Sequence, residues 1–198
     1  MLDSLIEFDK YLFVIINQQW SDVWLDPIMV FFSSKWTLVP MYIFAIIGFI
    51  RKFTTRFYIP LLICLLAFSL SDSISSRIFK PGFKRIRPAF EAELNPRLPD
   101  GKPGGHFGFV SSHASNSFAV YPLISMLLFT SIDRRKPMNK RAKIGLVFML
   151  GLSFFVSYSR VYLGVHYVGD VFFGALFGLV VGFSCWKLYS SQWIQKLM

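Results

Sequence analysis

Residues 143–187 read KIGLVFMLGLSFFVSYSRVYLGVHYVGDVFFGALFGLVVGFSCWK. The stretch holds two apolar runs, at residues 143–159 and 167–187, and a short segment with polar residues joins them. Each run is close to the roughly 20 residues that a helix needs to cross about 30 Å of hydrocarbon. The stretch therefore predicts two membrane-spanning helices with a short connection between them.

Three further apolar runs precede this stretch, at residues 27–50, 57–78 and 108–131. Hydrophobic residues make up 54% of the 198-residue chain and charged residues only 16%, a balance typical of membrane proteins rather than of soluble domains. We therefore expect an all-α integral membrane helical bundle with five to six transmembrane helices. It would form one domain over residues 1–198, with a transmembrane core at residues 27–190.

The first 26 residues mix apolar and charged positions. Apolar residues recur at helical spacing from Leu5 to Ile16, but acidic and basic residues interrupt them. Trp20 and Trp24 follow as candidate anchors at the membrane–water interface. The pattern favours an amphipathic helix that lies on the membrane surface, and a sixth, shallow or tilted span is the alternative.

The basic residues indicate how the bundle is oriented. With five spans, one face carries 11 of the 21 Lys and Arg residues and a single acid, Asp133. The densest basic run, from Arg134 to Lys143, lies in a short loop on that face, which the positive-inside rule places in the cytoplasm. The net charge of +10 thus belongs to short loops between apolar runs, so we expect a bilayer and no nucleic acid as partner.

Three polar segments lie at the outward ends of the predicted spans, at residues 80–88, 110–113 and 159–170. Because all three reach the same depth, their side chains can converge. Arginine forks and a lysine suit phosphate oxygens. The segments supply three such cations, two histidines and one carboxylate, namely Lys80, Arg87, Arg160, His113, His166 and Asp170.

The two histidines can divide the work of a phosphoryl transfer. His166 and Asp170 are four residues apart, so on a helix they share a face. A carboxylate there can hold the proton of one imidazole nitrogen and leave the other nitrogen free to attack phosphorus. His113 would then protonate the leaving oxygen. The residues therefore predict a two-step reaction through a phosphohistidine.

These segments resemble the three-part signature of the type 2 phosphatidic acid phosphatase family, which is related to the vanadium-dependent haloperoxidases. The signature is KxxxxxxRP, then PSGH, then SRxxxxxHxxxD. The first part matches in full at Lys80, Arg87 and Pro88, and the third matches in full at Ser159, Arg160, His166 and Asp170. The second part matches at Ser111 and His113, with Val110 in place of Pro and Ser112 in place of Gly.

The resemblance implies a role for each matching residue. His166 is the nucleophile, Asp170 supports it, and His113 protonates the leaving group, while the three cations hold the phosphate. Ser111 and the backbone amide of Ser112 line the phosphate pocket, and neither a metal nor another cofactor is required. Since free amides at a helix start favour an anion, we expect Ser112 to serve where the family has glycine.

The implied activity is removal of a phosphate or pyrophosphate group from an amphiphilic lipid in the bacterial inner membrane, with the site facing the periplasm or exterior. Undecaprenyl diphosphate and the 1-phosphate of lipid A fit an outward site best, and phosphatidylglycerol phosphate and phosphatidic acid are further candidates. A lipid-binding or transport protein without chemistry is the alternative, but it leaves the pairing of His166 with Asp170 unexplained. The sequence leaves the oligomeric state open.

Other polar residues receive simpler interpretations. His106 is expected to be a loop residue without a catalytic role, and Asp72 to pair with Arg77 or with a motif cation. The Pro- and Gly-containing connection at residues 88–108 predicts an irregular loop that could form a small lid. The remaining cations near the motifs are expected to reach the membrane interface or lipid head groups, namely Lys84, Arg85, Arg97 and Lys102.

Overall fold

The computed structural model describes residues 2–34, 36, 38–91, 93–130 and 137–195. Within these residues the regular structure is helical, and the only β-type pairing is an isolated bridge between Ile86 and Phe107. The prediction of an all-α fold is confirmed.

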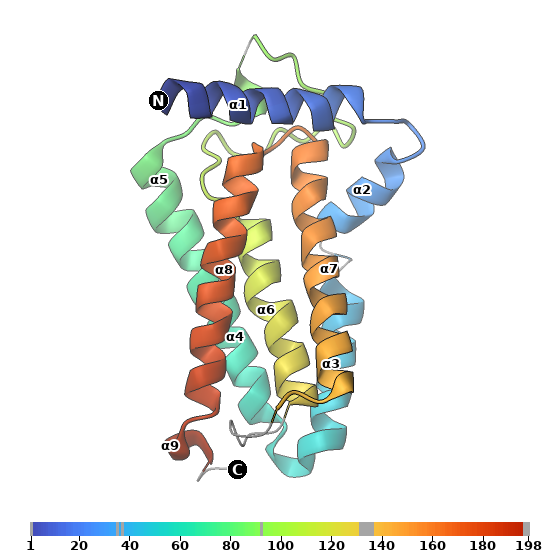
Figure 1. The fold of residues 1–198 in the computed structure, drawn as a ribbon, viewed down its shortest axis with the longest axis vertical. Helices are drawn as coiled ribbons and strands as arrows, with labels where there is room; N and C mark the ends of the chain where they lie inside the picture. Colours follow the sequence, from blue (N-terminus) through green and yellow to red (C-terminus); the bar gives the residue numbers. More distant parts are fainter. Residues whose placement is uncertain (1, 35, 37, 92, 131–136, 196–198) are drawn as a thin grey trace.

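Long helical rods run along the length of the molecule, and the termini lie at opposite ends (Figure 1). Helix α6 occupies the centre and packs against α4, α7 and α8. Helix α4 continues through a π-helical turn, Ser75–Phe79, into α5. The bounds of these helices are Tyr58–Ile74 for α4, Lys80–Phe83 for α5, Ser112–Phe129 for α6, Lys140–Tyr162 for α7 and Val168–Tyr189 for α8.

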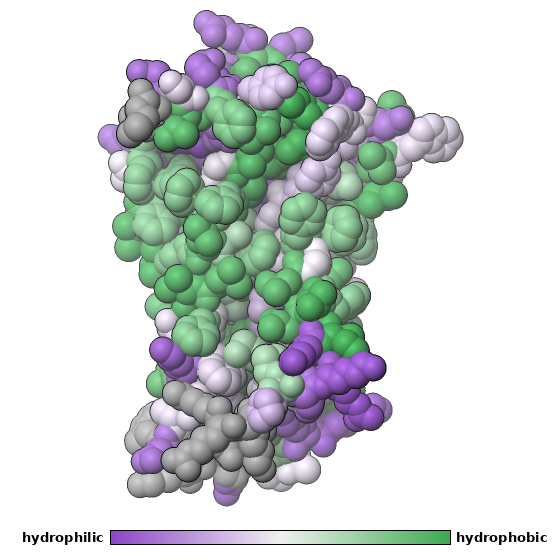
Figure 2. All heavy atoms as spheres, viewed as in Figure 1, coloured by the Kyte–Doolittle hydropathy of each residue, from purple (hydrophilic) through white to green (hydrophobic). Residues whose placement is uncertain are grey.

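Three of the rods are long and apolar enough to cross a membrane, as judged over the described residues: Tyr58–Phe83, Lys140–Tyr162 and Val168–Tyr189. Figure 2 shows that hydrophobic residues cover the middle of one face, while hydrophilic residues gather toward both ends. This banding is what a bilayer requires, since only apolar side chains face hydrocarbon at low cost. The protein is therefore a membrane helical bundle, and the count of five to six spans stays a prediction.

The apolar run at residues 27–50 does not form the single helix that its length suggested. It is divided into α2 (Asp26–Ser33) and α3 (Leu38–Phe53). The division follows Ser33, because the next residue, Ser34, has an extended backbone with φ −83° and ψ 155° that cannot continue a helix. Helix α2 packs against α7 near the end of the bundle that carries α1.

Helix α1 (Leu2–Val14) and a following π-helical turn, Ile15–Gln19, lie crosswise over one end of the bundle (Figure 1). The crosswise direction fits the amphipathic surface helix, and the choice between it and a sixth, shallow or tilted span stays a prediction. Large side chains of α1 and of the residues that follow the π-helical turn are exposed, as expected for a part of the chain that meets the membrane interface: Leu5, Phe8 and Tyr11, then Trp20 and Trp24.

Helices α6 and α8 approach closely because α8 presents glycines at every fourth position. Gly174, Gly178 and Gly182 face the backbone of α6, and a Cβ atom on Gly178 would lie 2.2 Å from the carbonyl oxygen of Ser115. Small residues at this spacing let two membrane helices pack backbone to backbone. The contact brings the first turns of α6 and α8 together, which is where two of the three motifs lie.

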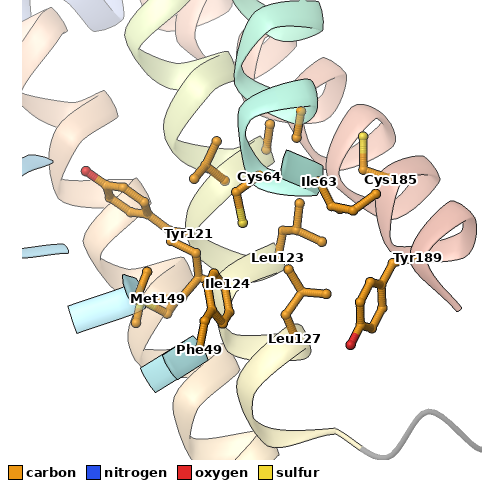
Figure 3. Packing of buried hydrophobic residues seen from close by; sticks show 14 of the residues in the cluster. Phe49, Ile63, Cys64, Tyr121, Leu123, Ile124, Leu127, Met149, Cys185 and Tyr189 are labelled. Atoms are coloured by element: carbon orange, nitrogen blue, oxygen red, sulfur yellow. The ribbon is translucent and has the colours of Figure 1, made fainter. Parts of the chain in front are cut away.

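The other half of the bundle is closed by a hydrophobic core to which α3, α4, α6, α7 and α8 all contribute (Figure 3). Cys64 and Cys185 belong to this core as buried free thiols, in keeping with their position inside apolar runs. The core holds the helices in register at the end away from α1, and its labelled members in Figure 3 include Phe49, Ile63, Leu123, Ile124, Leu127 and Met149.

Candidate active site

The three motifs converge at the end of the bundle that α1 covers. Lys80 lies where the long α4–α5 rod ends, Ser111 is the N-cap of α6, and His166 lies between α7 and α8. The backbone N–H of Ser111 donates to the carbonyl oxygen of Asp170 at 3.0 Å. This bond fixes the start of α6 against the start of α8.

His166 and Asp170 form a buried pair. The Nδ1 atom of His166 lies 3.2 Å from Oδ2 of Asp170, and their exposed fractions are 1% and 0%. The two residues do not share a helix, which corrects the expectation from their spacing: His166 precedes the N-cap Tyr167, and Asp170 lies in the first turn of α8. The pair forms because Asp170 reaches back to the cap, where it also accepts the N–H of Tyr167 at 3.1 Å.

The hydrogen bonds at Asp170 determine the tautomer of His166. Asp170 accepts a further bond from Arg85 Nη1 at 2.9 Å, so the carboxylate is surrounded by donors. An ionised carboxylate only accepts, so Nδ1 of His166 carries the proton and Nε2 keeps its lone pair. Burial, and the positive charges of Arg87, Arg160 and Lys80, lower the pKa of His166 well below its ordinary value. These surroundings favour the neutral imidazole, which is the form that can act as a nucleophile.

Arg87 is held in place by pairing between two extended segments. Its backbone N–H donates to the carbonyl oxygen of His106 at 3.1 Å, and its Nε donates to that of Phe107 at 3.1 Å. Gly108 follows, where an added Cβ would lie 2.9 Å from Oδ2 of Asp170 and 3.1 Å from Cγ of Arg87. Only glycine fits between these groups, so the 88–108 loop ends against the pair of His166 and Asp170.

Lys80 donates to Oγ of Ser112 at 2.9 Å, and Ser75 donates to the same oxygen at 3.0 Å. The side chain of Ser112 thus orients Lys80, a role that the motif comparison did not predict for this position. Ser112 is also the first residue of α6, where backbone N–H groups lack helical partners. Ser111 is buried, and its Oγ has no hydrogen-bond partner among the described residues, so it is available to a ligand.

Arg160 lies in the last turn of α7 and is bonded through Nη1 to Oγ of Ser33 in α2. Its Nε is buried and unpartnered within the described part of the chain. The guanidinium is therefore positioned by α2 and still has a donor to offer. An anion such as phosphate would satisfy it.

His113 lies in the first turn of α6 and lines a cavity of about 220 Å³ that extends into the bundle. The cavity is mostly apolar, but Asp72 and Asn116 also line it, and Asn116 donates to Asp72 at 2.9 Å. Asp72 therefore pairs with an amide, and the described residues contain no ion pair between it and either Arg77 or a motif cation, contrary to the prediction from the sequence. A leaving group in this cavity would lie beside His113.

The structure places two cations near the site, Arg85 and Arg97, differently from the sequence prediction. Arg85 and Arg97 were expected at the membrane interface, but Arg85 bonds Asp170 and Asp9, and Arg97 forms an ion pair with Asp26 at 3.0 Å. No local pattern marks these partners, because they are about 70 to 85 residues away along the chain. His106 is an exposed loop residue with its ring beside Phe90, in keeping with its expected place.

Residues 57–194 match the model of the PAP2 superfamily. The chain is 33% identical to a lipid A 4′-phosphatase of Porphyromonas gingivalis and 30% identical to one of Bacteroides thetaiotaomicron. These alignments cover 98% and 96% of this chain and 79% of each relative. Among solved structures, the chain is similar to a transmembrane PAP2-type phosphatidylglycerolphosphate phosphatase from Bacillus subtilis, with a TM-score of 0.71 and 26% identity over 94% of this chain and 85% of the other.

Proposed function

The chain belongs to the PAP2 superfamily and is a membrane lipid phosphatase, and we propose that it works through a phosphohistidine on His166. The observation that carries this proposal is the buried pair of His166 and Asp170. It leaves Nε2 of a neutral imidazole free in the field of Lys80, Arg87 and Arg160. A basic pocket that only bound lipid would need the cations but not the oriented imidazole.

In the first step, Nε2 of His166 attacks phosphorus while the bond from phosphorus to the leaving oxygen breaks. His113 transfers its proton to that oxygen, so the leaving group departs as an alcohol or, from a diphosphate, as a protonated phosphate monoester. Asp170 stabilises the positive charge that develops on the imidazole through the bond to Nδ1. The cations stabilise charge on the phosphoryl oxygens, which is the main requirement of this reaction type.

In the second step, water attacks the phosphohistidine and His113, now neutral, accepts its proton. The nitrogen–phosphorus bond breaks, inorganic phosphate is released, and both histidines return to their initial states. These residues supply a nucleophile, an acid and base, and charge stabilisation without a metal. We therefore propose a metal-independent reaction.

The substrate is proposed to be a lipid with a phosphorylated head group, because the site lies at the bundle end that α1 covers (Figure 1). An amphipathic helix of this kind lies at the level of lipid head groups. Lipid A comes first among the candidates, since two relatives that cover nearly the whole chain are lipid A 4′-phosphatases. Phosphatidylglycerol phosphate is the second candidate, because the similar solved structure acts on that class. Undecaprenyl diphosphate remains a candidate on the outward orientation alone.

We further propose that the site faces the periplasm across the inner membrane. Helix α7 begins at the opposite end of the bundle, and its first turn carries Lys140, Arg141 and Lys143 (Figure 1). Residues 131–136, which include the other basic residues of the run from Arg134 to Lys143, lie outside the described residues. The positive-inside rule assigns the basic end to the cytoplasm.

A phosphate-release screen tests this function. The purified full chain in detergent, with chelator present, is given lipid A, undecaprenyl diphosphate, phosphatidylglycerol phosphate and phosphatidic acid. We expect release to be fastest from lipid A, and mass spectrometry of the product shows whether the 4′- or the 1-phosphate is lost. Binding of these lipids without phosphate release would instead favour the lipid-binding or transport function, and activity that requires an added metal would contradict the metal-independent mechanism.

A further inference from the structure

We infer that Asp9 and Arg85 are positioning residues for Asp170, so that the surface helix α1 completes the active site. The inference rests on the proposed function of the pair of His166 and Asp170. It concerns Arg85, which holds a variable position of the first motif, and Asp9, which lies 161 positions before Asp170 in the chain.

Arg85 joins two carboxylates. Its Nη1 donates to Oδ1 of Asp170 at 2.9 Å, and its Nη2 donates to Oδ2 of Asp9 at 2.8 Å. The guanidinium carbon also lies 4.2 Å from the centre of the Tyr167 ring. Because the guanidinium is planar and its two terminal nitrogens are both engaged, the position of Asp9 sets the angle at which Arg85 meets Asp170.

Asp9 also bonds α8 directly. Its Oδ1 accepts the N–H of Gly169 at 2.8 Å, and Gly169 immediately precedes Asp170. The side chain of Asp9 is 14% exposed and that of Arg85 is 25% exposed, so water reaches these groups only in part. Asp9, Arg85 and the first turn of α8 thus form a closed ring of hydrogen bonds around the catalytic carboxylate.

Helix α1 is well anchored where it carries Asp9. Phe13 is fully buried, with its ring 5.5 Å from that of Tyr167. Asn17 is fully buried as well, and its amide donates to the carbonyl oxygen of Tyr162 at 2.7 Å and to that of Arg97 at 2.9 Å. These contacts hold α1 and the turn after it against both the α7–α8 connection and the loop at residues 88–108. Asp9 therefore has a defined position over the site.

In the proposed reaction, Asp170 must hold the imidazole of His166 in one tautomer and one orientation. Nδ1 of His166 keeps its proton, and the ring keeps its orientation, only if the carboxylate of Asp170 that accepts this hydrogen bond keeps its charge and its orientation. Arg85 bonds the oxygen that His166 does not use. Loss of the partner that orients a metal-ligating histidine or carboxylate typically costs 10- to 100-fold in activity, and we expect a loss of about that size for the partner of Asp170. Asp9 acts one bond further away, so its removal should cost less than removal of Arg85.

The test compares Asp9→Asn, Arg85→Lys and Arg85→Gln with wild type. For Arg85→Gln we expect kcat to fall by about 10- to 100-fold with KM nearly unchanged. Arg85→Lys should recover part of the loss, because it keeps the charge but cannot bridge two carboxylates. Asp9→Asn should lower kcat by roughly several-fold. The double variant Asp9→Asn with Arg85→Gln should be no slower than Arg85→Gln alone, because both changes act through one hydrogen-bond network.

Lys10→Gln is the matched control. It removes another ion pair between α1 and the loop, that of Lys10 with Glu91 at 3.0 Å, without touching Asp170, so kcat should stay at the wild-type value. Nitrogen NMR of labelled histidine adds a readout independent of turnover: His166 should lose its single Nδ1–H tautomer in Arg85→Gln but keep it in Lys10→Gln. Thermal melting in detergent verifies that each variant is folded.

Failure of the positioning inference and failure of the proposed function give different results. If the wild type releases phosphate and folded Arg85→Gln matches it in kcat and in tautomer, the positioning inference is wrong and the proposed function stands. An equal loss of kcat in Lys10→Gln would also overturn the inference, since docking of α1 alone would then explain the effect. If the wild type is inert toward every lipid, the proposed function fails, while the NMR comparison still decides whether Arg85 orients His166.

Discussion

Replacing His166 with alanine should abolish phosphate release, with kcat lower by about 10⁶-fold, as expected when the nucleophile of a covalent mechanism is lost. The substitution removes both the proposed attacking nitrogen and the buried bond to Asp170 that orients it. The measurement is steady-state phosphate release from the best lipid of the screen. Protein folded to the same melting temperature as wild type is required for the comparison.

His106→Ala serves as the matched substitution. It also removes an imidazole near the site, but from an exposed position beside Phe90, so activity should remain close to that of wild type. If the folded His166→Ala protein still turned over at the wild-type rate, the assignment of the nucleophile would be wrong. A loss of activity in both variants would point to damage to the loop at residues 88–108 rather than to loss of the nucleophile.

Replacing His113 with glutamine should have the second-largest effect. A positioned general acid contributes about 10²- to 10⁴-fold, and a lipid alkoxide is a poor leaving group without a proton. We therefore expect kcat for the lipid to fall by that range. The first turnover of p-nitrophenyl phosphate should fall far less, because nitrophenolate leaves without protonation.

Rapid-mixing measurements of the first turnover with the two substrates decide the role of His113. A large difference between them identifies it as the acid. Equal losses with both substrates would mean that His113 binds the phosphate or shapes the cavity instead, and the assignment as acid would have to be withdrawn.

The three motif segments could be located in the sequence because their polar residues are concentrated in short stretches at span ends. The apolar run lengths placed these segments at one depth, and the structure brings Lys80, His166 and Asp170 to the same end of the bundle. The spacing of His166 and Asp170 suggested a shared helix, although the contact arises from a cap. A four-residue separation brings the two side chains together in either geometry.

Other features depend on tertiary contacts that have no local signal. Composition shows how far an apolar run extends, but the division after Ser33 is a backbone feature within a run whose hydropathy is continuous. Likewise, Arg85 resembles any interfacial cation until Asp9 and Asp170 are seen on either side of it. The role of the Ser112 hydroxyl required the position of Lys80, which is set by the packing of α4 against α6.

The central claim, a covalent intermediate on His166, is tested most directly by trapping it. Enzyme in excess is mixed with lipid that carries ³²P in its phosphate, quenched into alkali within milliseconds, and digested, because phosphohistidine survives alkali and is lost in acid. We predict label on the peptide that contains His166 in the wild type, at times when substrate is being consumed, and none in His166→Ala. Complete consumption of substrate without labelled protein at any time, or label on a different residue, would contradict the mechanism.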